Sequence, residues 1–146
     1  MIYSNACEYG IRAMVHLVGA GDKRMLAREI SEREGIPGPF LGKVFQTLVK
    51  AGLLYSSKGP GGGFTLARDP SKITIYDIRQ AVDGVDDLEG CAVGLSQCSD
   101  DTPCPLHDSW KPVRAQIKTY LTKTTLTDMA AAMERKRAAA RRRRAR

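Results

Sequence analysis

The first fifty residues alternate apolar and polar positions with the period of an α-helix. Apolar residues stand at i, i+3, i+4 and i+7 in the first segment: Ile11, Met14, Val15 and Val18. This spacing predicts an amphipathic helix from about Asn5 to Gly19. A shorter helix is expected around Ile30, closed by Gly35, and a third follows the turn Pro37-Gly38-Pro39. The chain therefore opens with a helix, turn, helix arrangement.

The third predicted helix has two dissimilar faces. Its apolar face holds Leu41, Val44, Phe45 and Leu48. Its outward positions are small, polar or basic: Gly42, Lys43, Gln46, Thr47 and Lys50. Such a face suits a nucleic-acid groove because it offers hydrogen-bonding groups and positive charge.

Two short strands are expected next, around a glycine-rich loop. Leu53-Leu54-Tyr55 and Phe64-Thr65-Leu66-Ala67 flank the loop Ser56 to Gly63, which predicts a β-hairpin. In winged helix-turn-helix proteins a recognition helix reads the major groove and such a wing approaches the backbone. An ordinary surface turn is the alternative, and the residue order of a nucleotide-binding P-loop is absent. The DNA-contacting residues expected here are Lys43, Gln46, Thr47, Lys50, Ser56, Ser57, Lys58, Gly59, Gly61 and Gly62.

The second half of the chain has weaker periodicity. Thr74 and Asp77 have capping-box spacing, which predicts a helix that runs to Gly84. A long helix is expected from Ser109, with Pro112 in its first turn. Its apolar stripe is Trp110, Val113, Ile117, Tyr120 and Leu121. The threonine-rich residues 122–127 should break that helix before a short one formed around Leu126, Met129 and Met133.

These patterns divide the chain into four parts. Residues 1–84 form a winged helix-turn-helix, and 85–108 form an irregular loop. Residues 109–134 hold a long helix and a short one, and 135–146 are an Ala/Arg run without an apolar face, which we expect to be disordered. The predicted fold class is mostly α with a small β-hairpin.

The net charge of +7 is concentrated at one end. Residues 135–146 contain eight basic residues and no acids, which leaves 15 of the 23 Lys and Arg against all 16 acids in residues 1–134. Residues 1–72 are basic, with 10 basic groups against 6 acidic, whereas residues 73–110 hold one basic against eight acidic groups. If DNA is the partner, the N-terminal half should face it. The arginine-rich tail would bind phosphates without reading sequence, or else have no regulatory role.

Three cysteines and a histidine lie close together in the irregular loop. Cys91, Cys98, Cys104 and His107 form the pattern C-x6-C-x5-C-x2-H. Thiolates and imidazole are ligands for iron–sulfur clusters and for zinc. Zinc fits less well, because structural zinc sites use pairs two to four residues apart and only Cys104 and His107 have that spacing. A cluster-free thiol switch is a further alternative.

Several segments resemble the IscR/NsrR (Rrf-two) family of bacterial transcription regulators. They are the opening Glu8-Tyr9-Gly10-Ile11-Arg12-Ala13, the wing from Lys58 to Ala67, the segment from Ile73 to Ile78 and the three cysteines, so the resemblance covers residues 1 to about 130. It implies a winged helix-turn-helix homodimer in which long C-terminal helices cross between subunits beside an iron–sulfur cluster. Pro37, Gly38, Pro39 and Gly42 depart from the family around the recognition helix, so base contacts are not transferred.

The resemblance implies Cys91, Cys98 and Cys104 as cluster ligands. For the fourth ligand we favour His107, which IscR-like members use. The alternative is Glu8, at the position where NsrR-like members supply a carboxylate from the same or the other subunit. Cys7 is a third candidate, although a small apolar filler is the commoner role for such a residue. Cluster nuclearity, [2Fe–2S] or [4Fe–4S], stays open, and His16 receives no role.

The sequence thus predicts a DNA-binding transcriptional regulator, expected to be a repressor, whose operator affinity depends on a cluster that senses redox, nitric oxide or iron status. A zinc-containing or thiol-redox regulator of the same fold is the alternative, and a small electron-transfer protein would not need the wing. An enzyme is not expected, because no nucleophile–base motif or cofactor fingerprint is present. The chain has no long apolar run, so we expect a cytoplasmic, nucleoid-associated protein without a membrane or small-molecule partner.

Overall fold

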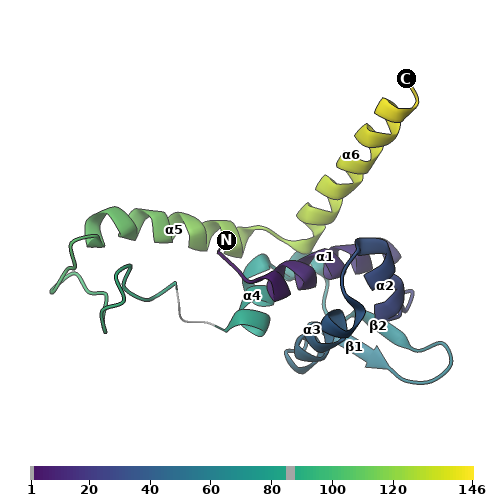
Figure 1. The fold of residues 1–146 in the computed structure, drawn as a ribbon, viewed down its shortest axis with the longest axis horizontal. Coiled ribbons are helices and arrows are strands. Elements are labelled where there is room, and N and C mark those ends of the chain that lie inside the picture. The colour runs from purple at the N-terminus through teal and green to yellow at the C-terminus, as the bar shows by residue number, and fades with distance from the viewer. Residues whose placement is uncertain (1, 85–87) are drawn as a thin grey trace.

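A computed structural model describes residues 2–84 and 88–146. Along the chain lie α1 (Asn5–Ala20), α2 (Ala27–Glu34), α3 (Gly38–Lys50), β1 (Leu54–Ser57), β2 (Gly63–Leu66), the 3-10 helix η1 (Pro70–Lys72), α4 (Ile75–Asp83), α5 (His107–Lys123) and α6 (Leu126–Arg144). Figure 1 shows α1 to α4 and the hairpin gathered in one body, with α5 and α6 leaving it in different directions. The predicted class, mostly α with a winged helix-turn-helix, is confirmed.

The core of the body lies between α1, α3 and α4. Met14 and Leu17 of α1 are buried against Phe45 and Leu48 of α3, and Ile78 of α4 closes the same cluster. Gly10 on α1 lets α3 approach closely, since a Cβ there would lie 3.3 Å from the Val44 side chain. The helical spacing of these apolar residues therefore produces one shared interior.

The wing is a two-stranded antiparallel hairpin that packs on α3. Leu54 pairs with Leu66 and Ser57 with Gly63, and the ring of Phe64 lies edge-on to that of Phe45 at 4.7 Å between centroids. A bridge between Met25 and Phe64 ties the hairpin to the segment before α2. The recognition helix and the wing are thus held in a fixed relation.

The joint between α5 and α6 is fastened to the start of α4. The amide of Ile75 donates to the carbonyl of Thr124 at 3.1 Å, and that of Leu126 donates to the carbonyl of Ile73 at 2.9 Å. Leu121 and Leu126 at the joint are fully buried. The predicted break within residues 122–127 is confirmed, and the backbone bonds make it a fixed corner.

The long helix begins two residues earlier than predicted. α5 starts at His107, so Pro112 lies in its interior rather than in its first turn. Proline has no N–H, and the helix loses the bond that this residue would give to the carbonyl of Asp108. The fourth candidate ligand therefore stands on the first turn of a helix, and the predicted loop of 85–108 ends at residue 106. Residues 85–87 of that loop lie outside the described residues.

The arginine-rich tail is helical, which corrects the prediction of disorder. α6 runs for 19 residues through Arg144, so the helix after the threonine-rich break is long. Thr125 and Asp128 form a capping box at its start, and Ala and Arg are among the strongest helix formers. The lack of an apolar face argued against packing, but intrinsic propensity sustains the helix. Among the described residues, no helix is both long and apolar enough to cross a membrane.

Candidate functional site

The predicted DNA face consists of α3 and the wing, which lie side by side. Lys43, Gln46 and Lys50 are exposed on α3, as predicted. Thr47 is half-buried, and its hydroxyl donates to the carbonyl of Lys43 at 3.2 Å. α3 begins directly after Pro37, and its first turn carries no acidic residue. The face therefore presents polar and positive groups without local negative charge.

The wing tip is shaped by its glycines. Gly59 and Gly61 have φ values of 80° and 70°, the left-handed region that favours glycine. Any side chain at Gly62 would collide with the carbonyl of Ser57. Ser56 and Lys58 are exposed on the hairpin, and Arg24, which the sequence did not single out, donates to the carbonyl of Gly61 at 3.4 Å. A guanidinium thus joins the predicted phosphate-contacting residues at the wing.

The cysteine loop places its candidate ligands in two contacting pairs. Cys98 Sγ lies 3.4 Å from His107 Nδ1, and the thiols of Cys91 and Cys104 are close enough for each to shift the pKa of the other. All three loop cysteines are half-buried free thiols. Among the described residues, no group of three or more His, Cys, Asp or Glu side chains converges on a single metal position. The loop therefore brings the four candidate ligands together as two separate pairs, Cys98 with His107 and Cys91 with Cys104.

Asp100 fixes the orientation of the His107 ring. His107 is 4% exposed, and its Nε2 lies 2.8 Å from Asp100 Oδ1. A carboxylate only accepts hydrogen bonds, so Nε2 carries a proton, and in the neutral ring Nδ1 then presents its lone pair to Cys98. Lys111 Nζ binds both Asp100 oxygens, at 2.7 and 2.8 Å. These hydrogen bonds, from Lys111 first and His107 second, lower the pKa of Asp100 to about 2.

Three basic residues on one side of α5 hold the loop. Besides Lys111, Arg114 donates to Cys98 Sγ at 3.4 Å and to the carbonyl of Glu89 at 3.3 Å, and Lys118 pairs with the Glu89 carboxylate. This set of residues was not among the site residues expected from the sequence. The sequence signal for these contacts is the i, i+3, i+7 spacing of the three basic residues, which places them on one face of a helix that follows an acidic loop.

The thiols of Cys91 and Cys104 differ in their electrostatic setting. Hydrogen bonds from the backbone amides of Val93 and Leu95 lower the pKa of Cys91. The amide of Leu106 acts in the same direction on Cys104, but desolvation and the nearby Cys91 and Cys98 outweigh it and raise the pKa of Cys104. Cys104 is therefore within electrostatic reach of both Cys91 and Cys98, and Cys91 is the thiol that ionises first within its pair with Cys104.

The donor set fits an iron–sulfur cluster in its chemistry. It consists of three thiols and one imidazole oriented through its second nitrogen by a carboxylate, which is the usual support for a ligating histidine. Trp110 Nε1, on the first turns of α5, is buried and has no acceptor among the described residues. Cluster sulfur atoms accept such hydrogen bonds, so the residues present suit the group.

The two other candidate ligands lie elsewhere in the chain. Cys7 is fully buried in the core, and burial raises its pKa to about 12. Glu8 pairs with Arg12 at 3.7 Å near the start of α1, where Tyr3 hydrogen-bonds Tyr120 of α5. The helix rises about 20 Å between His107 and Tyr120. Cys7 therefore fills the core, and Glu8 pairs with Arg12 at the end of α5 opposite to His107.

His16, which received no role, is half-buried between α1 and α2. Its Nδ1 lies 2.7 Å from Glu34 Oε1, and Arg137 of α6 lies 3.6 Å from the same carboxylate oxygen. These contacts join α1 and α2 of the body to α6, so His16 has a structural role.

Comparisons with known proteins identify relatives along almost the whole chain. A sequence model of the Rrf2 family, described as iron-dependent transcriptional regulators, matches residues 3–132. An HTH-type transcriptional regulator of Aquifex aeolicus is 38% identical over 131 residues, covering 88% of this chain and 91% of that protein. The HTH-type transcriptional regulator IscR of Vibrio atlanticus is 34% identical over 123 residues, covering 84% of this chain and 70% of that protein.

Solved structures agree with the fold. CymR, the global cysteine regulator of B. subtilis, superposes with a TM-score of 0.76 at 25% identity, covering 88% of this chain and 95% of that one. IscR of T. potens superposes with a TM-score of 0.71 at 29% identity, covering 89% and 86%. These relatives are transcriptional regulators rather than enzymes. The chain belongs to the Rrf2 family of winged helix-turn-helix transcription regulators.

Proposed function

We propose that this protein is a homodimeric regulator whose operator affinity depends on an iron–sulfur cluster held by Cys91, Cys98, Cys104 and His107. The observation that carries the proposal is the His107 ring, buried, facing Cys98 through Nδ1 and fixed by Asp100 at Nε2. His16 also pairs with a carboxylate, but His107 has in addition a thiol contact at its other ring nitrogen. The 34% identical IscR of Vibrio atlanticus and the iron-dependent description of the family support the same conclusion.

The two donor pairs suit a cluster in which each iron takes two protein ligands. Cys98 with His107 and Cys91 with Cys104 would then each serve one iron, and [2Fe–2S] is the type with that division. When bound, such a cluster supplies a centre that can be oxidised, nitrosylated or lost. Glu8 would compete with His107 only if it came from the other subunit.

Coupling from the loop to the DNA face runs through α5. Lys111, Arg114 and Lys118 hold the loop, and the corner after Lys123 is hydrogen-bonded to the start of α4. A change in the order of the loop would therefore change the position of α5. Because α5 is attached to the body that carries α3, the position of α3 would change with it. If two α5 helices cross in the dimer, their angle sets the separation of the recognition helices relative to half-sites one DNA turn apart.

The surface of α5 supports its role in dimerisation. Val113 is 44% exposed and Tyr120 is 45% exposed, although both belong to the apolar stripe. The C-terminal part of α5 packs on the body, through Ile117 and Leu121 against Ile75 and Leu88. The rest of the helix stands away from the body in Figure 1. An apolar stripe of this length needs a partner, and a second α5 would cover it.

The decisive experiment is anaerobic purification followed by absorption spectroscopy and assays of iron, sulfide and zinc. Replacing Cys91, Cys98 and Cys104 by Ser should abolish the visible absorption and the cluster-dependent difference in DNA affinity. His107→Ala should weaken cluster retention, whereas Glu8→Ala should not. Retention of iron and sulfide by the triple variant would refute the ligand assignment, and stoichiometric zinc in the wild type would favour the zinc alternative.

A thiol-redox regulator is the second candidate, and a specific contact favours it. Cys91 and Cys104 are close enough for each to shift the pKa of the other, and the lowered pKa of Cys91 makes it the better nucleophile. CymR, which shares the fold, is named a global cysteine regulator. Under this alternative, an oxidant would join Cys91 to Cys104, and Cys98→Ser would leave the DNA response intact. Under the cluster proposal, Cys98→Ser abolishes it.

A further inference from the structure

The outer half of α6 has no role in the DNA face or the cysteine loop. It comprises residues 135–144, and the family model ends before it at residue 132. Its side chains are almost all Ala and Arg, and the basic ones are exposed: Arg135, Lys136, Arg137 and Arg141 to Arg144. Successive residues of an α-helix turn by about 100°, so the four consecutive arginines point to all sides of it.

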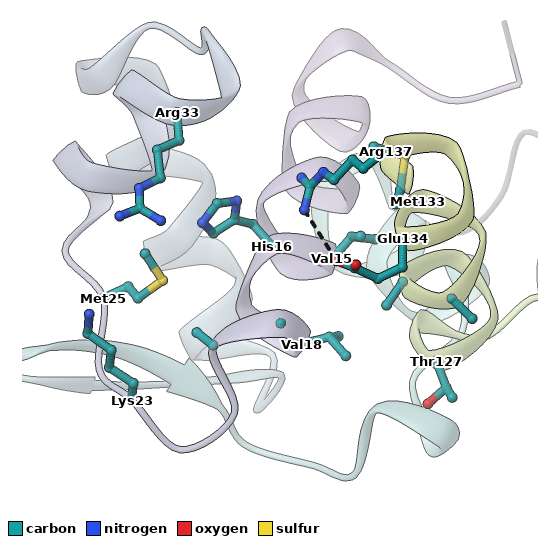
Figure 2. Close-up of a pocket in the computed structure, with 14 residues that line it drawn as sticks. Val15, His16, Val18, Lys23, Met25, Arg33, Thr127, Met133, Glu134 and Arg137 are labelled. Carbon is teal, nitrogen blue, oxygen red and sulfur yellow. Dashed lines mark ion pairs between the residues drawn. The ribbon is translucent and has the colours of Figure 1, made fainter. Parts of the chain in front are cut away.

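This half of α6 leaves the body on the side away from the DNA face. Figure 1 shows α6 running outward in the direction opposite to α3 and the hairpin. The inner half is anchored by Leu126 and Met129 at the core. Farther along, a cavity lined by Val15, His16 and Met133 separates α6 from α1, as Figure 2 shows.

Arg137 makes the last contact between α6 and the body. It pairs with Glu34 of α2 at 3.6 Å and with Glu134 at 3.7 Å. Beyond it, no hydrogen bond or ion pair joins residues 138–144 to other helices or strands within the described parts of the chain. Along the helix axis, the four arginines thus lie about 6 to 10 Å beyond this last contact. Their own subunit does not bring them to the DNA that its α3 and wing would occupy.

The composition of the outer half selects its partner. A membrane-surface helix needs an apolar face, and this segment has none. Single-stranded RNA is usually bound by aromatic stacking, and no aromatic residue follows Tyr120. An α-helix fits the major groove of duplex DNA, where arginines on opposite sides of the helix reach the phosphates of both strands. The segment has no Asn, Gln or Ser, so it lacks the side chains that recognise A·T base pairs. Contacts with phosphates therefore dominate its binding to DNA.

We propose that the outer half of α6 binds the phosphate backbone of a second DNA duplex, so that a regulator seated on one site bridges to another segment. Binding by this helix is independent of sequence and sensitive to salt. Each phosphate contact contributes about 0.9 to the slope of log affinity against log salt, so four arginines contribute about 3 to 4.

The test is a two-duplex capture assay with the full chain. A short duplex selected by the protein from a random pool is fixed to beads, and capture of a second, labelled random duplex is measured. The wild type should capture the second duplex. Replacing Arg141, Arg142, Arg143 and Arg144 together by Gln should reduce capture at least tenfold and leave binding of the first duplex unchanged. The matched Arg→Lys variant should retain capture, because it keeps the charge, and circular dichroism should show the same helix content in both.

The outcomes separate this inference from the DNA face. Loss of first-duplex binding in Lys43→Ala or Lys58→Ala tests α3 and the wing, whatever α6 does. If the four-Gln variant binds the first duplex more weakly with a flatter salt slope, the tail acts on the same duplex and bridging is refuted. Equal capture by wild type and variant refutes it as well. If the protein captured labelled RNA but not the second duplex, the outer half of α6 would be an RNA-binding surface, and the proposal would be overturned.

Discussion

The winged body and the cysteine loop are held together by different forces. In the body, side chains such as Phe45 and Ile78 are completely buried in one apolar cluster. In the loop, Val93 and Leu95 are 48% and 57% exposed. Leu88 packs on Leu121, whereas the contacts of Glu89 and Asp100 to α5 are ion pairs at the surface. Burial of apolar side chains contributes far more to stability than exposed ion pairs do.

This difference matches the tasks proposed for the two regions. A surface that reads DNA must keep its helix and wing in register, which a shared apolar core ensures. A sensor segment must change its order when its chemistry changes, and such segments come from the low-stability end of a structure. Because α5 holds the loop and is fixed to the body, the weaker region can act on the stronger one without unfolding it.

The largest effect should come from the body. Phe45→Ala removes a fully buried ring that packs on Phe64, and we expect a loss of about 3 to 5 kcal/mol in the free energy of unfolding. Urea denaturation followed by circular dichroism measures it. Tyr55→Ala, which removes an aromatic ring that is 63% exposed on β1, should change stability by less than about 0.5 kcal/mol.

The two regions would not differ in this way if the cysteine loop also contributed substantially to the free energy of unfolding. We expect the triple Cys→Ser variant to unfold at the same urea concentration as the cluster-free wild type. An equal loss in this variant and in Phe45→Ala would show that loop and body form one cooperative core.

The second effect concerns the support of His107. Asp100→Ala removes the acceptor at Nε2, so the ring loses its fixed tautomer, and cluster retention should fall about 10- to 100-fold. The ¹⁵N chemical shifts of His107 in the cluster-free protein report the tautomer directly. Asp101→Ala is the matched control, since this exposed neighbour makes no hydrogen bond to a described residue. A tautomer unchanged in Asp100→Ala would remove Asp100 from the site.

Regular periodicity made the body predictable. The core residues of α1 and α3 follow helical spacing, and the break after the long helix is marked by threonines. Strand bounds differed by one or two residues, since both strands are short and the hairpin ends depend on tertiary contacts such as the Met25–Phe64 bridge.

The cysteine loop was predictable in its donors but not in their arrangement. The spacing of Cys91, Cys98 and Cys104 indicated metal chemistry, yet it could not show that Asp100 and Lys111 orient His107, because those contacts arise from a loop that folds back on α5. In the arginine-rich tail, the prediction failed for the secondary structure itself. Its lack of an apolar face suggested disorder, whereas Ala and Arg propensities keep residues up to Arg144 helical.

A third effect tests whether Cys7 belongs to the body or to the site. Cys7→Ala should leave iron and sulfide content unchanged and cost about 1 kcal/mol of stability, as a small core truncation does. Burial raises the pKa of Cys7 from 9.0 to about 12, so the unfolded chain loses this proton first. The contribution of Cys7 to stability is therefore complete below pH 9 and is lost as the pH rises towards 12.

Unfolding measured between pH 8 and 12 checks this sign. The wild type should lose stability more steeply above pH 9 than Cys7→Ala does. A slope should remain in the variant above pH 10, since burial also raises the pKa of Tyr3 to about 12. If the Cys7→Ala variant contained less iron than the wild type but had the same free energy of unfolding, Cys7 would be a cluster ligand rather than a core residue.

The smallest effect lies in the tether between loop and helix. Lys118→Ala removes the partner of Glu89, and burial does not strengthen this pair because both side chains are about half exposed. We expect hydrogen exchange of the loop amides to rise about twofold at low salt, with no change in the unfolding transition. Added salt should raise exchange in the wild type to the level of the variant. Lys123→Ala, at the end of the same helix, is the control, because it lies beyond the loop. A wild-type loop insensitive to salt would mean that packing rather than charge holds it, and the two regions would then differ in degree only.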